Sequence, residues 1–472
     1  MSVQETIGLL GHLVDGEIVR VGQTFPVTDP SSGEVVAQVP VADTALLDRA
    51  ISAAVRAQPA WAADVTARRA AINAMCDAIQ ANYAELDQLA TLEKGVPGAG
   101  AELMAAVWYG RHIAASPIPT DVIQDDDVKT ITLERAPVGV VAAIAPWNAP
   151  GLILSEKIFS AFLLGNTVVA KPSPFTPLAT LRLAQLWQQV VPPGVLNVLA
   201  GDDAVGAALV ADPRVRLISF TGSVAVGKRI AAQAGQEMKR VVAELGGNDA
   251  AIVLADVDVK KAAPLLFHAA FMLSGQACAA VKRVLVHESV YDDLVSELAA
   301  IAQSTEVGPG TSFAPLSTRP QFERVCELVQ DALEHGGKAV SGGAPLDGPG
   351  FYYPPTIMTG VGPGVRIVDE EQFGPVLPVI PFSAVEDAIA QANDTEYGLC
   401  ASVWSSDIAR ASQLAQRLEA GTVLVNNHTE VAPHVPFGGC KSSGIGRAGG
   451  QPGLDEYAEF KTVIVYKSAD RV

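Results

Sequence analysis

The chain has 472 residues, of which 49% are apolar and 18% charged, and its formal net charge is −18. This length predicts two or three domains with large cores, and the composition is typical of a packed globular enzyme rather than a disordered scaffold. A surface this acidic repels nucleic acid and anionic membranes, which excludes both as general partners and means that an anionic ligand needs a local positive site.

The five cysteines are spread along the chain without a CxxC pair. This usage is typical of free thiols in a reducing compartment, and neither the cysteines nor the seven histidines have the spacing of a metal site. The first residues lack a basic start followed by an apolar run, and the richest apolar segment, 158–170, is too short to span a membrane. We therefore expect a cytoplasmic protein without a metal.

The N-terminal third contains three segments with different sequence patterns. About 45 residues rich in turn signals come first, and residues 43–111 then follow helical spacing typical of helices packed on a larger body. At 121–133 an acidic run precedes an alternating strand, a pattern typical of an exposed arm.

The rest of the chain alternates short apolar strands with helices, such as the helical stretch 178–190. We expect strands at 138–145, 166–170, 195–199, 215–220 and 241–245, and again at 251–254, 284–286, 401–404 and 422–425. This alternation of strands and helices predicts an α/β protein with a parallel, doubly wound sheet and a second α/β domain. In such sheets ligands bind beyond the carboxyl ends of the strands.

Cys278 and Glu244, which lies 34 residues before it, are a candidate nucleophile and base. A thiolate can attack an electrophilic carbon to give a covalent intermediate, and a carboxylate can activate the water that releases the product. A free cysteine in an apolar setting is more often an inert core residue, so this alternative stays open from the residues alone.

Three further segments place polar groups just beyond predicted strands. Thr221-Gly222-Ser223 runs into a helix, where free amides and the helix dipole attract phosphate. Lys171 and Ser173 follow another strand, at a position where a nucleotide is expected. Asn148 follows a third and could donate to the oxygen of a carbonyl under attack. Each segment alone is also compatible with an ordinary turn.

Taken together, seven motifs resemble those of the aldehyde dehydrogenase superfamily in order and spacing, over nearly the whole chain. They are Pro146-Trp147-Asn148, Lys171-Pro172-Ser173, Phe220-Thr221-Gly222-Ser223, Glu244-Leu245-Gly246-Gly247-Asn248, Gly275-Gln276-Ala277-Cys278, Glu371-Gln372-Phe373-Gly374-Pro375 and Pro436-Phe437-Gly438-Gly439.

The resemblance implies a subunit of three parts. A Rossmann-like dinucleotide-binding domain would comprise 1–118 and 138–246, a catalytic domain 247–456, and a small β oligomerisation arm 119–137 and 457–472. It also implies a homodimer or homotetramer that takes a small-molecule aldehyde as substrate.

The resemblance further implies oxidation of the aldehyde to the acid with NAD or NADP, through a thiohemiacetal and a thioester on Cys278. Glu244 would be the base, Asn148 the oxyanion donor and Lys157 a member of a proton relay. A base at Glu244 favours hydrolysis of the thioester over transfer to coenzyme A. The implied cofactor contacts are Trp147, Lys171, Ser173, Gly222, Ser223, Gly227, Leu245, Glu371 and Phe373.

Two positions depart from the family pattern. Pro174 stands where many NAD-dependent relatives carry a ribose-binding glutamate, so the choice between NAD and NADP is open and we favour NAD. Ala448 stands where relatives often have a glutamate that relays protons.

The residues that the resemblance places around the substrate give less information. They are Ala149, Glu156, Met272, Gln276, Ala277, Ala279 and the loop 428–434. Ala149 and Glu156 replace aromatic walls, which predicts a roomier or more polar entrance. Two rival classes remain, a thiol-dependent hydrolase without a dinucleotide and a non-catalytic oligomer that keeps the fold.

Overall fold

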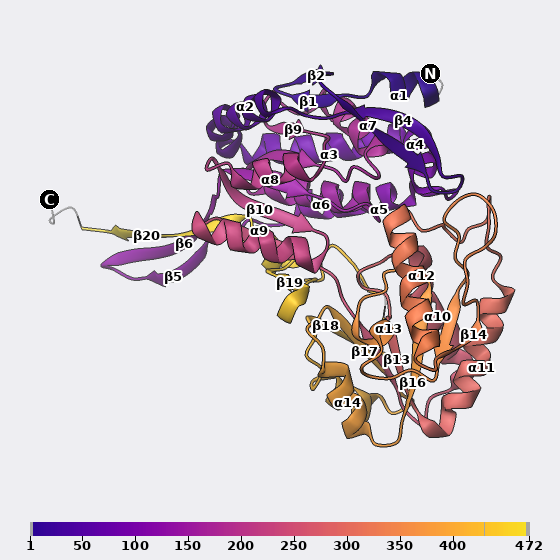
Figure 1. Cartoon of the computed structure of the whole chain (residues 1–472). Helices are drawn as coiled ribbons and strands as arrows, with labels where there is room; N and C mark the ends of the chain where they lie inside the picture. The colour runs from indigo at the N-terminus through magenta and orange to yellow at the C-terminus, as the bar shows by residue number, and fades with distance from the viewer. Residues whose placement is uncertain (1–2, 429, 469–472) are drawn as a thin grey trace.

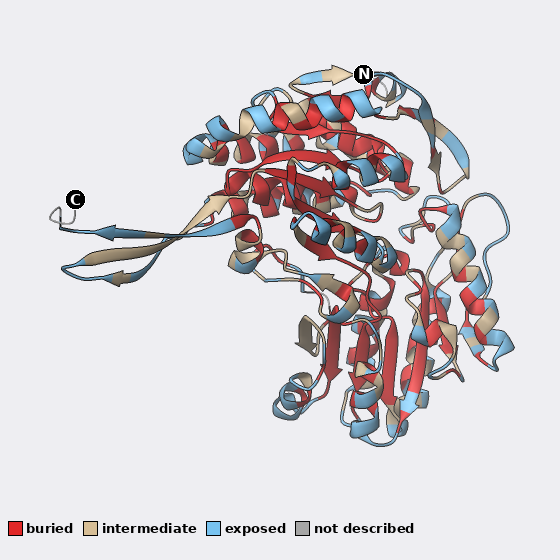
Figure 2. Ribbon diagram, turned by 60° about the vertical axis from the view of Figure 1, so that its left-hand side comes forward, coloured by how far each residue is buried: buried red, intermediate tan, exposed pale blue. Residues whose placement is uncertain are grey.

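The computed structural model describes residues 3–428 and 430–468, so Thr429 of the predicted substrate loop and the last four residues of the predicted arm lie outside it. Figure 1 shows two α/β bodies, one above the other, and a thin arm that projects from the upper one and carries the C-terminus. In Figure 2 the central strands of both bodies are buried, whereas the arm is intermediate to exposed.

The upper body contains an eight-stranded sheet with the order β19-β11-β10-β7-β8-β9-β1-β2. Neighbours from β11 to β9 pair in parallel, and the outer strands are antiparallel. The strands are β1 (His12–Val14), β2 (Glu17–Val19), β7 (Val140–Ile144), β8 (Thr167–Lys171), β9 (Leu196–Val198), β10 (Val215–Thr221), β11 (Arg240–Glu244) and β19 (Gly444–Ile445). The parallel core of this sheet therefore lies where the sequence predicts it.

Helices cover both faces of this sheet, because each face is apolar. One face packs against α2 (Thr44–Ala63), α8 (Asp203–Ala211) and α9 (Val224–Gln236). The other packs against α3 (Val65–Ala81), α4 (Tyr83–Lys94), α5 (Ala101–Ala115), α6 (Pro150–Leu163) and α7 (Leu178–Trp187). This is the doubly wound arrangement, which brings the ends of β7, β8, β10 and β11 to one edge.

The first 40 residues contain more regular structure than their turn signals indicate. Besides β1 and β2 they form α1 (Val3–Leu9) and a two-stranded ribbon of β3 (Thr24–Asp29) and β4 (Glu34–Pro40). These elements are short and irregular, with a register shift in the ribbon between Val27 and Thr28, so they leave only a weak periodic signal in the sequence.

The lower body contains a seven-stranded sheet with the order β14-β15-β16-β13-β12-β17-β18, in which only β14 is antiparallel. Its strands are β12 (Ala250–Val253), β13 (Arg283–His287), β14 (Lys338–Ser341), β15 (Thr356–Thr359), β16 (Val376–Phe382), β17 (Cys400–Trp404) and β18 (Thr422–Val425). One face packs against α10 (Val259–Phe271) and α11 (Glu288–Ser304). The other packs against α12 (Arg319–Glu334), α13 (Arg366–Asp369), α14 (Val385–Asn393) and α15 (Ile408–Ala415).

The arm is a three-stranded antiparallel sheet in which β6 (Lys129–Pro137) lies between β5 (Asp121–Asp125) and β20 (Ala458–Tyr466). Arg135 anchors it, because its guanidinium bonds Asp455 of α16 (Gly450–Asp455) at 2.7 Å and Asp121 at 3.0 Å. The expectation of strands in an exposed arm agrees with this sheet. The predicted domain boundaries stay a prediction, and β19 crosses them by pairing with β11.

Candidate active site

The ends of three strands of the upper sheet face the lower body across a cavity of about 210 Å³. Pro146, Trp147 and Asn148 follow β7, Thr221 to Ser223 follow β10, and Leu245 and Gly246 follow β11. The lower body contributes Cys278, Gln321, Arg324, Glu371 and Phe373. Predicted nucleophile, oxyanion donor and cofactor contacts thus lie around one space.

Cys278 follows a strained loop. The short helix η1 (Met272–Gly275) includes Leu273 and Ser274 at φ values of 51° and 56°, and Gly275 follows at 75°. A methyl group on Gly275 would lie 2.2 Å from the Gly374 carbonyl oxygen, so only glycine allows this close approach. Strain of this kind persists only where the surroundings hold it in place.

The side chain of Gln276 supplies part of that support. Its amide donates to the carbonyl oxygens of Leu273 at 3.0 Å and Pro315 at 3.1 Å, and its Oε1 accepts from the Ser317 N–H at 2.8 Å. Gln276 was predicted to line the substrate pocket, but these bonds show a buried side chain that fixes the nucleophile loop.

Asn148 is joined to this loop directly. It lies just before α6, is buried, and donates from Nδ2 to the backbone oxygen of Gln276 at 2.9 Å. An amide nitrogen carries two hydrogens, so one remains for an oxygen in the cavity. Asn148 is therefore held against the loop that leads into Cys278, and both residues line the same cavity.

Glu244 is buried at the end of β11, and neither carboxylate oxygen has a hydrogen-bond partner among the described residues. Burial raises the pKa of Glu244 to about 8, and the charge of Lys157 opposes this shift. Glu244 does not line the 210 Å³ cavity, whereas its neighbour Leu245 does. Its charge nevertheless reaches Cys278, whose thiol pKa is raised to about 12 by burial and by Glu244 and other carboxylates.

Lys157 lies on α6 and is almost fully buried. Its ammonium donates to Ser219 Oγ at 3.1 Å, and Ser219 is 2.8 Å from the Tyr457 hydroxyl. Burial lowers the pKa of Lys157, and the charges of Glu156 and Glu244 raise it. Lys157 therefore lies in a buried polar cluster behind Glu244, as a proton-relay residue would.

A second cavity, of about 260 Å³, lies on the other side of the end of β10. Lys171, Asp203, Phe220 and Arg229 are among its lining residues, between α8 and α9. Burial lowers the pKa of Lys171 to about 8. Phe220 lines this cavity and Thr221 to Ser223 line the first, so both cavities border the same strand end, and Lys171 places a cation at the second.

The remaining predicted cofactor residues occupy different places. Trp147 and Phe373 stack edge-to-face with ring centroids 5.4 Å apart, and Glu371 accepts from the Gly247 N–H at 3.0 Å. Ser223 Oγ caps α9, while Gly227 lies inside α9 with Leu245 against it. Ser173 is buried, and its Oγ accepts from the Phe175 N–H at 3.3 Å.

The lining is also shaped for a close ligand. A methyl group on Gly246 would lie 2.2 Å from Glu371 Oε2, and one on Gly222 would lie 2.4 Å from the Phe220 ring. A side chain at either position would displace a lining residue, so the glycines let these strand ends pack closely around the space where the implied cofactor would lie.

Sequence analysis missed several cavity residues. Gln321 and Arg324 extend from α12, and Arg229 from α9. Each occurs in an ordinary amphipathic helix, where a polar residue is most simply explained by solvent. Only the packing of these helices against the strand ends reveals them.

Most of the residues predicted to surround the substrate lie near Cys278. Glu156 and His428, which were predicted to do the same, do not form an open entrance to the cavity. Ala277 and Ala279 are buried on either side of it, and Ala149 and Met272 are half-buried. Glu156 borders a space of only about 10 Å³, roughly that of one water molecule. His428 is buried with Nδ1 2.8 Å from Ser402 Oγ and lines neither large cavity.

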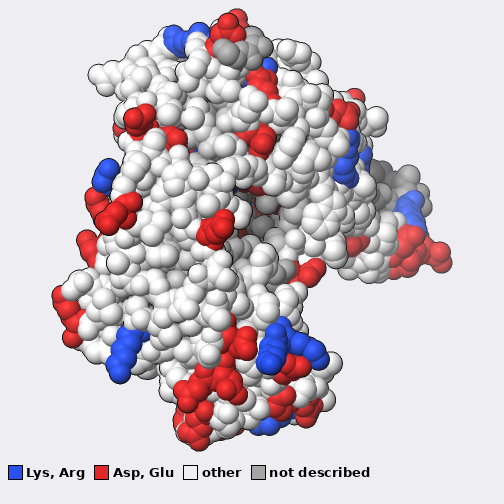
Figure 3. Space-filling model, turned by 90° about the vertical axis from the view of Figure 1, so that its right-hand side faces the viewer, with Lys and Arg blue, Asp and Glu red and all other residues white. Residues whose placement is uncertain are grey.

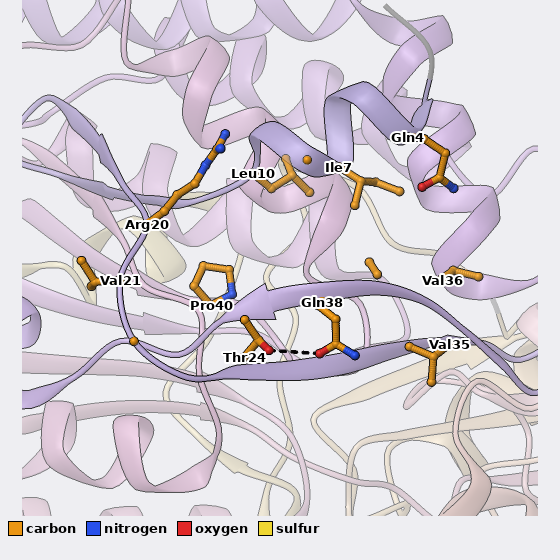
Figure 4. Close-up of a pocket in the computed structure, with 13 residues that line it drawn as sticks. Gln4, Ile7, Leu10, Arg20, Val21, Thr24, Val35, Val36, Gln38 and Pro40 are labelled. Carbon is orange, nitrogen blue, oxygen red and sulfur yellow. Dashed lines mark hydrogen bonds between the residues drawn. The ribbon is translucent and has the colours of Figure 1, made fainter.

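A hollow larger than either of these cavities lies elsewhere. It has about 620 Å³ and is bordered by α1 and by the β3–β4 ribbon (Figure 4). Ile7, Leu10 and Val36 are among its walls, and Arg20 is its one ionisable side chain among the described residues. This groove offers no nucleophile or base, so the chemistry belongs to the smaller cavity at Cys278.

Two kinds of site are absent from the described residues. No group of three or more His, Cys, Asp and Glu side chains in 3–428 and 430–468 is placed to hold a metal ion. Within the same residues no helix has the length and apolar character needed to cross a bilayer.

Comparison with known proteins shows the family of the chain. The model of the aldehyde dehydrogenase family matches residues 19–463. The NAD+ complex of an aldehyde dehydrogenase from Bacillus cereus is similar at a TM-score of 0.95, with 35% identity and coverage of 99% of this chain and 98% of that one. An NADP-dependent enzyme from E. coli is similar at a TM-score of 0.94, with 34% identity over 97% and 99% of the chains. The betaine aldehyde dehydrogenase of Cereibacter sphaeroides is 36% identical over 96% of each chain. The chain therefore belongs to the aldehyde dehydrogenase family and is an NAD(P)-dependent enzyme that oxidises aldehydes.

Proposed function

We propose that Cys278 is the nucleophile of this oxidation, with Asn148 and the Cys278 N–H as oxyanion donors and Glu244 as the base. The observation that carries this assignment is the bond from Asn148 Nδ2 to the backbone of Gln276, which holds the amide beside Cys278 in one cavity. An amide aimed at an oxyanion typically contributes about 10² to 10³ in rate.

The thiol must lose its proton before it attacks, because the thiolate is the nucleophile. Glu244 has an unpaired carboxylate and a pKa near neutrality, so it can accept that proton. The sulfur then adds to the aldehyde carbon, and Asn148 and the Cys278 amide stabilise the oxygen of the thiohemiacetal. The bound nicotinamide cofactor supplies the oxidation, by which the thiohemiacetal becomes a thioester.

Release of the acid needs an attack by water on this thioester. Glu244 again serves as the base and Lys157 as its charged neighbour, which favours hydrolysis over transfer of the acyl group to another thiol. Since Ala448 carries no ionisable group, the proton leaves through Lys157 and water. Glu244 has to turn toward the cavity for both steps.

For the cofactor we propose an extended pose across both cavities. Lys171 would hold one ribose and Glu371 the other, with Ser173, Gly222, Ser223, Gly227 and Leu245 at the strand ends and the Trp147–Phe373 pair at the nicotinamide. On the face shown in Figure 3 acidic side chains are spread over the surface and basic ones form small groups, so these local amides and cations matter for an anionic cofactor. Both NAD and NADP are compatible with Pro174, which brings no charge to the site.

We further propose that the arm joins subunits into a homodimer or homotetramer, and that the enzyme works in the cytoplasm, where a catalytic thiol stays reduced. The three-part division into cofactor domain, catalytic domain and arm follows the two sheets and the arm, with the crossing at β19 noted above. Exposed apolar side chains along the arm support its role in assembly, among them Val122, Ile123, Ile464 and Val465.

An aldehyde panel assayed in parallel with NAD+ and NADP+ tests this function. We expect reduction of one or both cofactors with at least one aldehyde, and loss of this signal in C278A because no other group supplies the nucleophile. C326A is a matched control, since Cys326 is also a partly buried free thiol but lies on α12. Cofactor reduction that survives in C278A would contradict the assignment.

A further inference from the structure

Lys282 is a buried cation beside the nucleophile loop for which sequence analysis gave no role. It lies four residues after Cys278, immediately before β13, and only 1% of it is exposed. A buried ammonium is costly unless hydrogen bonds and opposite charges compensate it, so its partners indicate what it does.

The two hydrogen bonds that its ammonium makes to the described residues both go to the nucleophile loop. Nζ donates to the carbonyl oxygens of Gly275 at 2.8 Å and Ala277 at 2.9 Å. These two carbonyls flank Gln276, whose own side chain fastens the loop from the other side. Lys282 therefore holds the segment that leads into Cys278 after its strained turn.

The bond to Ala277 also fixes the direction of the Cys278 amide. In a trans peptide the C=O and the following N–H point in opposite directions. Because the Ala277 oxygen faces Lys282, the Cys278 N–H points away from it. No described residue is seen to accept a hydrogen bond from this N–H, which leaves it available for an oxyanion.

The ammonium also lies among the charges of the site. Burial lowers the pKa of Lys282, while Glu371, Asp249 and Cys278 raise it, and Nζ is 5.3 Å from the centre of the Phe373 ring. The thiol of Cys278 faces the carboxylates of Glu244, Asp249 and Glu371, all of which oppose its ionisation, and Lys282 favours it. Burial opposes the thiolate most, these carboxylates add to that when they are charged, and the ammonium of Lys282 favours it.

We propose that Lys282 is a positioning residue for the reaction: its ammonium favours the thiolate of Cys278 and clamps the Gly275 and Ala277 carbonyls so that the Cys278 N–H is aimed as an oxyanion donor. This inference rests on the proposed role of Cys278 as nucleophile. It assigns to Lys282 no contact with the substrate.

Two alkylating reagents of similar size test the charge without a cofactor. Iodoacetamide is neutral and iodoacetate is an anion, and the rates of modification of Cys278 can be followed by mass spectrometry of its peptide. Both rates scale with the thiolate fraction and with access, so their ratio reports the local charge. We expect K282M to lower the iodoacetate to iodoacetamide ratio about three- to tenfold, as loss of a nearby charge predicts at high effective dielectric.

The absolute rates give a second readout. Each unit of rise in the thiol pKa lowers the thiolate fraction tenfold at a pH below that pKa, so we expect K282M to react with iodoacetamide at least about 10-fold more slowly at pH 8. K282R keeps the charge and should restore much of the ratio. K338M is the matched control, because Lys338 is exposed on β14 and should leave both rates unchanged.

Several outcomes would overturn the proposal. An unchanged ratio in folded K282M, or a K282R protein whose ratio equals that of K282M, would show that the charge of Lys282 does not act on Cys278. If K282M does not fold, K282Q replaces it with the same criterion. Folding of K282R alone among the three would support the clamp. Cofactor reduction in C278A would instead remove the proposed function, while the alkylation ratio would still report on Lys282.

Discussion

Ionisable side chains are buried around Cys278 in unusual number, and their charges act on one another. Glu244 and Lys157 are buried and Glu371 is half-buried, and each shifts the pKa of at least one other group of the site. Burial favours the neutral form of each group, and neighbouring opposite charges favour the charged form. For Glu244 and Glu371 this balance gives pKa values of about 8 and about 7, in the range that acid–base catalysis uses.

The pKa of Glu244 predicts the pH dependence of acid release. A carboxylate acts as a base only when deprotonated, and its pKa in the folded protein is about 8. We therefore expect the deacylation rate to rise about tenfold per pH unit below 8 and to level off above it. Single-turnover and steady-state assays of cofactor reduction between pH 6 and 10 would measure this rise.

Two substitutions separate the contributions to this profile. E244Q should lose steady turnover, because a neutral amide cannot deprotonate water, and should keep a slower single-turnover burst, because the thiol can still lose its proton to solvent. Loss of the burst together with steady turnover would show that Glu244 acts mainly in the first step. K157M should move the profile to higher pH by about 1 unit or more, since it removes the charge that lowers the pKa of Glu244. An unmoved profile would separate Lys157 from the base.

Among the elements, the loops at strand ends determine the site more than the helices and strands do. Gly275 illustrates this, since its backbone approaches Gly374 in the loop that carries Glu371 and Phe373. The two loops can pack so closely only because no side chain separates them. The nucleophile and the predicted nicotinamide contacts are thereby positioned together.

G275A should consequently damage catalysis and stability together. The added methyl group would lie 2.2 Å from a backbone oxygen at a φ of +75°, so the loop must move. We expect a loss of about 100-fold or more in kcat/KM from displacement of Cys278, and a cost of about 1 to 3 kcal/mol in the free energy of unfolding. Assays and chemical denaturation would measure both.

G235A provides the comparison for that experiment. Gly235 lies on α9, and a methyl group there would meet no atom within 4 Å. Alanine favours a helix over glycine by up to about 1 kcal/mol, so G235A should be as stable as the parent or more so, with unchanged activity. A G275A protein that behaves like G235A would show that the close approach is unnecessary.

At the scale of the whole molecule, the exposure of apolar side chains on the arm is difficult to explain if the chain remains a monomer. Its three strands extend away from the upper body (Figure 1), and their apolar side chains face outward. Ile464 is 51% exposed although it lies in the middle of β20. Edge strands of this kind usually pair or are covered by another chain.

If the arm mediates assembly, a charge on it should reduce the oligomer. We expect I464D to lower the molar mass measured by light scattering to that of a dimer or monomer, because a buried unpaired carboxylate would weaken the interface. M238D is the control, since Met238 is 84% exposed but outside the arm. A change of mass in M238D, or none in I464D, would contradict this role of the arm.

Sequence analysis also left three strands and two cations of the lower body without a predicted structure or role. β14, β15 and β16 were not expected as strands, because β14 is partly exposed and β15 has only four residues, while β16 contains two prolines and reads as a loop. Lys282 and Arg324 gave no signal, since a lone cation in a chain is most simply explained by solvent. Their roles depend on what packs against them.

By itself, the sequence determined the parallel core of the upper sheet, four strands of the lower one and the family, and it led to the proposal of Cys278, Asn148 and Glu244 as site residues. It could do so because buried parallel strands are continuous apolar runs and because the motifs at their ends are local. Only the tertiary structure decided that Gln276 supports the loop, that Glu244 lies behind the cavity and that Lys282 reaches the Gly275 and Ala277 carbonyls. These features depend on hydrogen bonds, burial and charge interactions between segments that are distant in the sequence. The spacing of residues within one segment does not predict such interactions.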